Sequence, residues 1–158
     1  MSVIIQGYQL RIGQFGQQII KGPLVLPATG VTATIATVAG GSVLVTSMLG
    51  LVTTATTATS ASLSIGTAPT VGTPQVAGIA AAAPITSLQV GTWIGALVNA
   101  GAAGTLVVGG TAGNAIFLPT PFLVSAGTIT WTGSVGTNTG QIKWYFTYVP
   151  LDNGATLS

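Results

Sequence analysis

The segment from Gln141 to Val149 alternates along the chain in a way that limits the structures open to it. One set of alternate positions holds Ile142, Trp144, Phe146 and Tyr148, and the other holds Gln141, Lys143, Tyr145, Thr147 and Val149. A period of two residues is that of a β-strand, whose side chains point by turns to opposite faces of a sheet. The sequence therefore predicts a strand over 141–149 with one buried, largely aromatic face.

A second segment, residues 128–132, has the same period. Ile129 and Trp131 share one face, and threonines occupy the other. The residues between the two segments, SVGTNTG, are rich in turn formers. We expect these two segments to form an antiparallel hairpin whose loop centres near Asn138.

The rest of the chain is also divided into short β-forming runs. Residues 40–66 are dense in β-branched side chains, which favour a pleated sheet and predict strands over 43–57 and 61–65. Runs separated by Gly and Pro predict further strands over 32–38, 71–81, 88–94, 104–108 and 116–124. The alanine-rich residues 80–83 are also compatible with a helical turn.

This strand pattern predicts an all-β fold. Frequent short strands and turns are typical of an antiparallel β-sandwich or a jelly-roll-like barrel. The length suits one domain, which we place at residues 23–158. Residues 1–22 mix apolar residues with Gln and Gly, and we expect them to form an extended N-terminal arm.

Charged residues are scarce: Arg11, Lys21, Lys143 and Asp152 are the four in the chain. They make up 3% of the residues, whereas about 25% is usual in globular proteins. Thr, Ser, Asn and Gln are therefore expected to form the water-facing coat. Three scattered cations cannot neutralise the several phosphates on which nucleic-acid binding depends, so we expect no nucleic-acid partner.

The chain also lacks most side chains that carry chemistry. It has no His and no Cys, and it has one acidic residue, so paired-carboxylate, His-based and thiolate–zinc sites cannot be built from one copy. A Ser–Lys pair is formally possible, but Lys143 is more simply a solvated strand residue. The glycine-rich GTLVVGGTAG lacks the Lys of a phosphate loop. We expect no enzyme activity, no cofactor, no metal and no small-molecule substrate.

A membrane-spanning segment is not expected either. The most apolar stretch, residues 76–104, is interrupted by Pro84, Gln89 and Asn99, whereas a spanning helix needs about 20 mostly apolar residues in succession. The first 22 residues lack the charged start and continuous apolar run of a secretory signal.

Three tryptophans have two possible roles. Trp93, Trp131 and Trp144 can form a stacking surface for carbohydrate, or they can belong to the core or to a subunit interface. Large aromatic residues at alternate strand positions favour the core or the interface.

Two ordered segments carry a resemblance to a known family. The first is the Val/Thr-rich run VLVT…GLVTT at residues 43–54. The second holds the Thr-rich residues 128–132, a short polar loop, the Lys143–Trp144 strand and the PLDNGA turn at 150–155. Together these segments resemble small bacteriophage and prophage virion proteins.

This resemblance implies a structural protein of the virion. We expect a capsid decoration, or cement, protein that assembles in the bacterial host cytoplasm. It would bind the outside of the phage head as a homotrimer and stabilise contacts between subunits of the major capsid protein. Tyr8, Leu10, Ile12 and Phe15 in the arm, together with Trp93, are the expected contact residues. The alternatives are a phage tail or fibre component and a carbohydrate-binding β-sandwich module.

Overall fold

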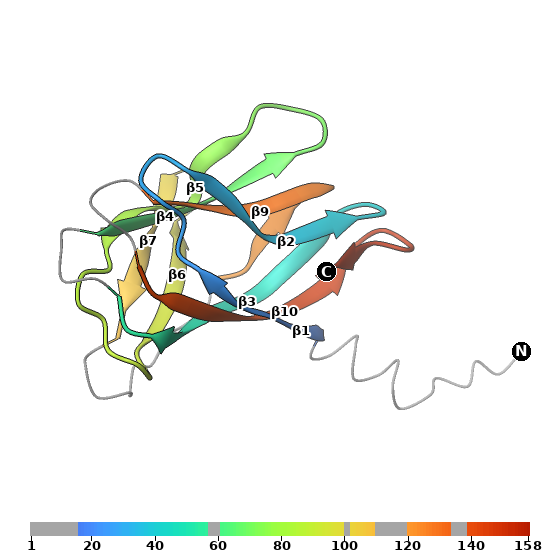
Figure 1. Cartoon of the computed structure of the whole chain (residues 1–158). Coiled ribbons are helices and arrows are strands. Elements are labelled where there is room, and N and C mark those ends of the chain that lie inside the picture. The colour runs from blue at the N-terminus through green and yellow to red at the C-terminus, as the bar shows by residue number, and fades with distance from the viewer. Residues whose placement is uncertain (1–15, 57–60, 100–101, 110–119, 134–138) are drawn as a thin grey trace, which may run out of the picture.

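The computed structural model describes residues 16–56, 61–99, 102–109, 120–133 and 139–158, and within these ranges the ordered elements are strands (Figure 1). They are β1 (Gln17–Val25), β2 (Thr32–Ala39), β3 (Val43–Thr54), β4 (Ser62–Pro69), β5 (Gln75–Pro84), β6 (Trp93–Asn99), β7 (Ala102–Val108), β8 (Phe122–Val124), β9 (Gly127–Gly133), β10 (Gln141–Pro150) and β11 (Thr156–Leu157).

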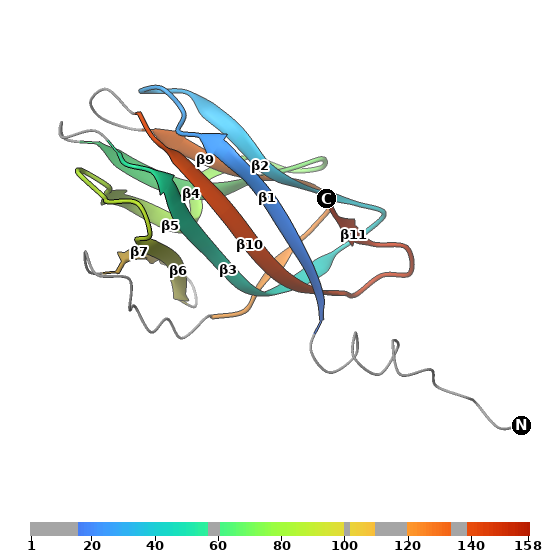
Figure 2. The same cartoon turned by 60° about the horizontal axis from the view of Figure 1, so that its bottom comes forward.

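These strands form one mixed sheet that curls into a nearly closed barrel (Figures 1 and 2). The order along the sheet is β1-β10-β3-β6-β7-β5-β4-β9-β2-β11, and β8 pairs with the beginning of β3. β5 and β7 run parallel, while the other strand pairs are antiparallel. The predicted all-β fold of the sandwich or barrel type is confirmed.

β10 shows the predicted division into two faces. Ile142, Trp144, Phe146 and Tyr148 are buried, and the intervening residues are half-buried. β10 lies between β1 and β3. Its buried side faces the barrel interior, where Trp144 contacts Trp131. The period-two pattern predicted this strand almost to its ends.

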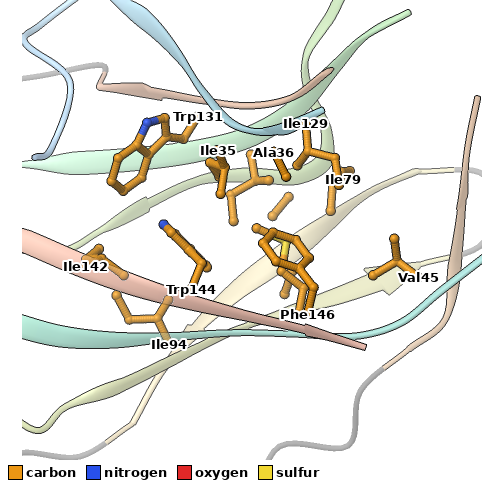
Figure 3. Packing of buried hydrophobic residues seen from close by; sticks show 14 of the residues in the cluster. Ile35, Ala36, Val45, Ile79, Ile94, Ile129, Trp131, Ile142, Trp144 and Phe146 are labelled. Carbon is orange, nitrogen blue, oxygen red and sulfur yellow. The ribbon is translucent and has the colours of Figure 1, made fainter. Parts of the chain in front are cut away.

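The predicted hairpin between residues 128–132 and 141–149 is wrong. β9 pairs with β2 and β4, whereas β10 pairs with β1 and β3. The two strands lie on opposite walls of the barrel, and Trp131 packs edge-to-face against Trp144 across the interior (Figure 3). The two apolar faces therefore meet in the core. The loop near Asn138 lies outside the described residues.

The barrel core is built around these two indoles. Their ring centroids are 5.7 Å apart and their planes are inclined by 78°, a geometry that aromatic pairs favour. A side chain at Gly50 of β3 would come within 2.9 Å of Ile142 and Trp144. Glycine at this inward position thus leaves the space that Trp144 fills.

Several boundaries differ from the predicted ones. Residues 17–22 were assigned to the arm, but Gln17–Lys21 pair with β10 as part of β1. Residues 86–91 form turns, so the strand predicted over 88–94 begins instead at Trp93. Residues 80–83 lie in β5 and form no helical turn. Alanine is a weak strand former, but pairing with β4 and β7 decides its conformation here.

The threonine coat is also only partly as predicted. Thr130 and Thr132 flank Trp131 in β9 and belong to the other face of the strand, yet both are buried. The Thr132 hydroxyl pairs with the Thr32 hydroxyl of β2 at 2.7 Å. Buried hydroxyls need such partners, so part of the threonine content serves the interior of the sheet.

Candidate interaction surfaces

The described charged residues lie apart from one another. Lys143 projects from the outer side of β10, with its Nζ 5.5 Å from the centroid of the Tyr145 ring. Asp152 follows β10, and its Oδ2 accepts a 2.6 Å hydrogen bond from the backbone N–H of Ser42. Neither arrangement resembles a catalytic pair: one is a cation over an aromatic ring and the other joins two turns.

The described part of the chain was also compared with the requirements of a metal site and of a membrane-spanning helix. It has no group of three side chains suited to holding a metal ion. It contains no helix with the length and hydropathy needed to cross a bilayer. The described residues also include large apolar side chains that are exposed, and these define candidate contact surfaces.

One such surface covers the outer side of β1, β10, β3, β6 and β8, and we call it the outer face. On β3 and β10 its residues alternate with buried ones, and on β1 its residue Ile20 is exposed between two half-buried neighbours. It includes Gln18, Ile20, Leu44, Ser47, Leu49, Leu51, Trp93, Leu123, Gln141, Lys143, Tyr145, Thr147 and Val149. The outer face carries large apolar side chains together with the polar side chains of Gln18, Ser47, Gln141, Lys143 and Thr147.

The strand register brings these side chains together in rows. Tyr145 lies opposite both Ile20 and Leu49 at the centre of the outer face. Cross-strand neighbours on one face of a sheet are within contact distance of each other. The row is therefore a continuous strip of side chains across β1, β10 and β3.

Two further rows flank this strip. Toward one end, Leu51 joins Lys143 on β10 to Trp93 on β6. Toward the other end, Leu44 joins Val149 on β10 to Leu123 on β8. The outer face thus extends along most of β10.

Exposure on the outer face is uneven. Ile20 is 51% exposed and Leu123 is 62% exposed, while Leu49, Tyr145 and Trp93 are half-buried by their neighbours. The Trp93 and Tyr145 rings lie with centroids 5.6 Å apart and planes inclined by 46°. Contiguous exposed apolar patches on soluble proteins usually mark contact sites.

The predicted contact residues have different outcomes. Trp93 lies on the outer face as part of an aromatic pair. Tyr8, Leu10, Ile12 and Phe15 lie outside the described residues. The sequence pattern did put Tyr145 on the side of its strand away from Trp144. It did not reveal which strands lie beside β10, and hence which side chains surround Tyr145.

The other two tryptophans cannot provide a sugar-stacking surface. Trp131 is 1% exposed and Trp144 is 0% exposed, so both belong to the core. Their indole N–H groups and the Thr92 hydroxyl have no hydrogen-bond partner among the described residues. Trp93 is left as the one tryptophan near the surface.

A second apolar feature is the turn between β4 and β5. Val71 in this turn is 90% exposed and Val76 at the start of β5 is 50% exposed. Figure 1 shows the turn projecting from the top of the barrel. An isolated exposed valine is common, but two on one projecting hairpin form a small apolar tip, which we call the hairpin tip.

Comparisons with protein-family models, with curated proteins and with solved structures found no match for this chain.

Proposed function

We propose that this chain is a structural protein of a bacteriophage particle, of the capsid decoration or cement type. The observation that carries the proposal is the character of the described surface. Large apolar side chains lie on several of its sides, and its charged residues are Lys21, Lys143 and Asp152. Soluble monomeric proteins usually carry many more charged residues on their surfaces. This surface therefore suits a chain whose surface is partly buried in contacts with other subunits.

The energetics of coverage favour assembly. Apolar area removed from water stabilises a complex by about 25 cal/mol per Å², and a stable interface buries about 1,600 Å² in total. Loss of translational and rotational freedom offsets part of this gain. Few charged groups need to be desolvated at such an interface, so desolvation removes little of the remaining free energy of association.

In this proposal, the hairpin tip contacts the major capsid protein. Val71 is the most exposed large apolar side chain in the described ranges, and its position on a projecting turn lets it enter a depression on a neighbour. The arm residues Tyr8, Leu10, Ile12 and Phe15 are proposed to bind adjacent subunits. The family resemblance would place the protein as a homotrimer at three-fold junctions of the head.

The proposal is tested by adding the purified chain to phage heads that lack it and measuring bound protein after sedimentation. We expect saturable binding, and we expect Val71→Asp with Val76→Asp to weaken it at least tenfold. Val71→Thr, which keeps the shape of the side chain, serves as the matched control. A deletion of residues 1–15 tests the arm and keeps Gln17–Lys21, which pair with β10. Absence of binding to heads would contradict the proposal.

The place in the particle is tested separately by electron microscopy of the intact virion. Density of this size at three-fold positions on the outside of the head would support the decoration role. Density at the tail would instead support a tail or fibre component. Absence from the whole particle would exclude both structural roles.

A second candidate function, carbohydrate binding, rests on Trp93 and Tyr145. These rings adjoin on the outer face, and aromatic rings at a surface can stack against sugars. Trp131 and Trp144 are buried, however, which leaves a smaller platform than three tryptophans would give. Titration with host glycans tests this role: a change in tryptophan fluorescence that Trp93→Ala abolishes would support it, and an unchanged signal would exclude it.

A further inference from the structure

The outer face has the dimensions of a subunit interface. It spans four neighbouring strands, because β6 and β8 each flank β3 over part of its length. Strands lie about 4.8 Å apart and rise about 3.4 Å per residue. Over the 10 residues of β10, these spacings give a flat projection of about 650 Å². A stable interface needs about 800 Å² of accessible area from each partner, and a corrugated surface has more area than its projection.

The form of the outer face also indicates the partner. A ring of three copies requires two different, complementary patches on each subunit, whereas a two-fold pair uses the same patch twice. The rows through Leu51, Tyr145 and Leu44 lie on one patch, in which the polar row of Gln18, Thr147 and Ser47 separates the last two. Two sheets can pack face to face about 10 Å apart through such patches. We propose that two copies of this chain pair through their outer faces about a two-fold axis.

The charges near β10 select the direction of this pairing. Lys143 lies near one end of the strand and Asp152 follows the other end. An antiparallel arrangement with the axis near Thr147 brings each Lys143 toward Asp152 of the other copy. A parallel arrangement brings the two lysines together, which opposes association. The aromatic end of one copy then covers Leu44 and Leu123 of the other.

This pairing uses the outer face and leaves the hairpin tip free, so the proposed contact of the hairpin tip with the major capsid protein does not depend on it. It also differs from the homotrimer that the family resemblance implies. The number of copies in solution therefore discriminates between the two arrangements.

The test measures the mass of the full chain by native mass spectrometry and its association by sedimentation equilibrium. We expect a dimer. Leu49→Glu places a carboxylate at the centre of the outer face and should raise the dissociation constant at least a hundredfold. Val71→Glu adds the same charge at the hairpin tip and should leave the dimer intact. Far-ultraviolet circular dichroism verifies that both variants remain folded.

The direction of pairing has its own test. Lys143→Glu brings two carboxylates together in the antiparallel dimer, so the dissociation constant should rise about tenfold at low salt and less at high salt. Adding Asp152→Lys to the same chain should reverse most of this change. If Lys143→Glu leaves association unchanged or strengthens it, the antiparallel arrangement is excluded.

A Cys variant gives a second measure of geometry. The chain has no cysteine, so Thr147→Cys supplies a single thiol near the proposed axis. A short bismaleimide should then link two copies efficiently, while Val71→Cys under the same conditions should not be linked. Equal linking of both variants would contradict an axis near Thr147.

The outcomes separate this inference from the proposed function. A monomer or a trimer of the unmodified chain overturns the two-fold pairing, whether or not the chain binds phage heads. A dimer that the outer-face substitution dissociates supports the pairing, even if no head binds it.

Discussion

The two faces of β10 carry similar side chains in different surroundings. Trp144 and Phe146 on the inner face are fully buried, whereas Tyr145 between them is half-buried on the outer face. The inner aromatics meet the opposite wall of the barrel through Trp131. The outer aromatic lies beside neighbours in the same sheet, Trp93 among them.

This difference separates folding from association. An inner side chain has contacts on every side, so removing it leaves a cavity that the surrounding sheet cannot close. An outer side chain loses much less on truncation, because solvent already covers part of it. The inner face is therefore expected to determine stability, while the outer face is free to determine which partners bind.

The largest effect that tests this comparison is expected from Trp144→Ala. Loss of a fully buried indole should lower the free energy of unfolding by about 3–5 kcal/mol, a large part of the total of a typical domain. Trp93→Ala on the outer face should cost about 1 kcal/mol. Guanidinium unfolding followed by circular dichroism measures both.

A second variant that keeps an aromatic ring allows a measurement if Trp144→Ala does not fold. Trp144→Phe should fold and cost less than Trp144→Ala, because it also removes an indole N–H that has no partner among the described residues. Equal costs for the alanine variants at Trp93 and Trp144 would remove the distinction between the two faces.

The next effect comes from adding a group instead of removing one. Gly50→Ala places a methyl group 2.9 Å from Ile142 Cγ2 and from Trp144 Cζ3, and overpacking of this kind costs about 1–3 kcal/mol. The neighbouring outward residue offers a matched comparison, since Leu49→Ala should cost about 1 kcal/mol. Thermal unfolding of the two variants provides the measurement. A Gly50→Ala protein as stable as the original would show that the inner face has spare volume.

The sequence predicted local elements better than their partners. The alternation in 141–149 depends on burial of one face, so it fixed β10 and separated Trp144 from Tyr145. The same reasoning placed Ile129 and Trp131 together on β9 correctly. Strand pairing could not be predicted from this alternation. A period of two indicates which face of a strand is apolar, but it does not indicate which strand lies beside it.

The failed hairpin shows the consequence. A turn-rich loop between two strands usually joins neighbours, but here the strands lie on opposite walls so that both tryptophans are enclosed. The outer face was missed for the same reason. Its members come from β1, β3, β6, β8 and β10, and their proximity depends on register between distant segments.

A smaller effect is expected where β10 ends. Asp152 Oδ2 accepts the Ser42 N–H and joins the turn after β10 to the turn between β2 and β3. Asp152→Ala should lower the free energy of unfolding by about 1 kcal/mol, since the bond is charge-assisted but exposed. Asp152→Asn retains an acceptor and should cost less. Hydrogen exchange at the Ser42 amide provides the measurement, and unchanged protection in Asp152→Ala would contradict this role.

The smallest effect on stability is expected at the hairpin tip, which holds the most exposed large apolar side chain among the described residues. Val71 is 90% exposed, so Val71→Asp should change the free energy of unfolding by less than about 0.5 kcal/mol. If the valine contacts a partner, the same substitution should sharply weaken attachment to phage heads. A stability-neutral variant that loses attachment would assign Val71 to a partner surface. A variant that unfolds more easily would instead show that the hairpin tip contributes to stability. Exposure would then not separate the residues that stabilise the fold from those that bind partners.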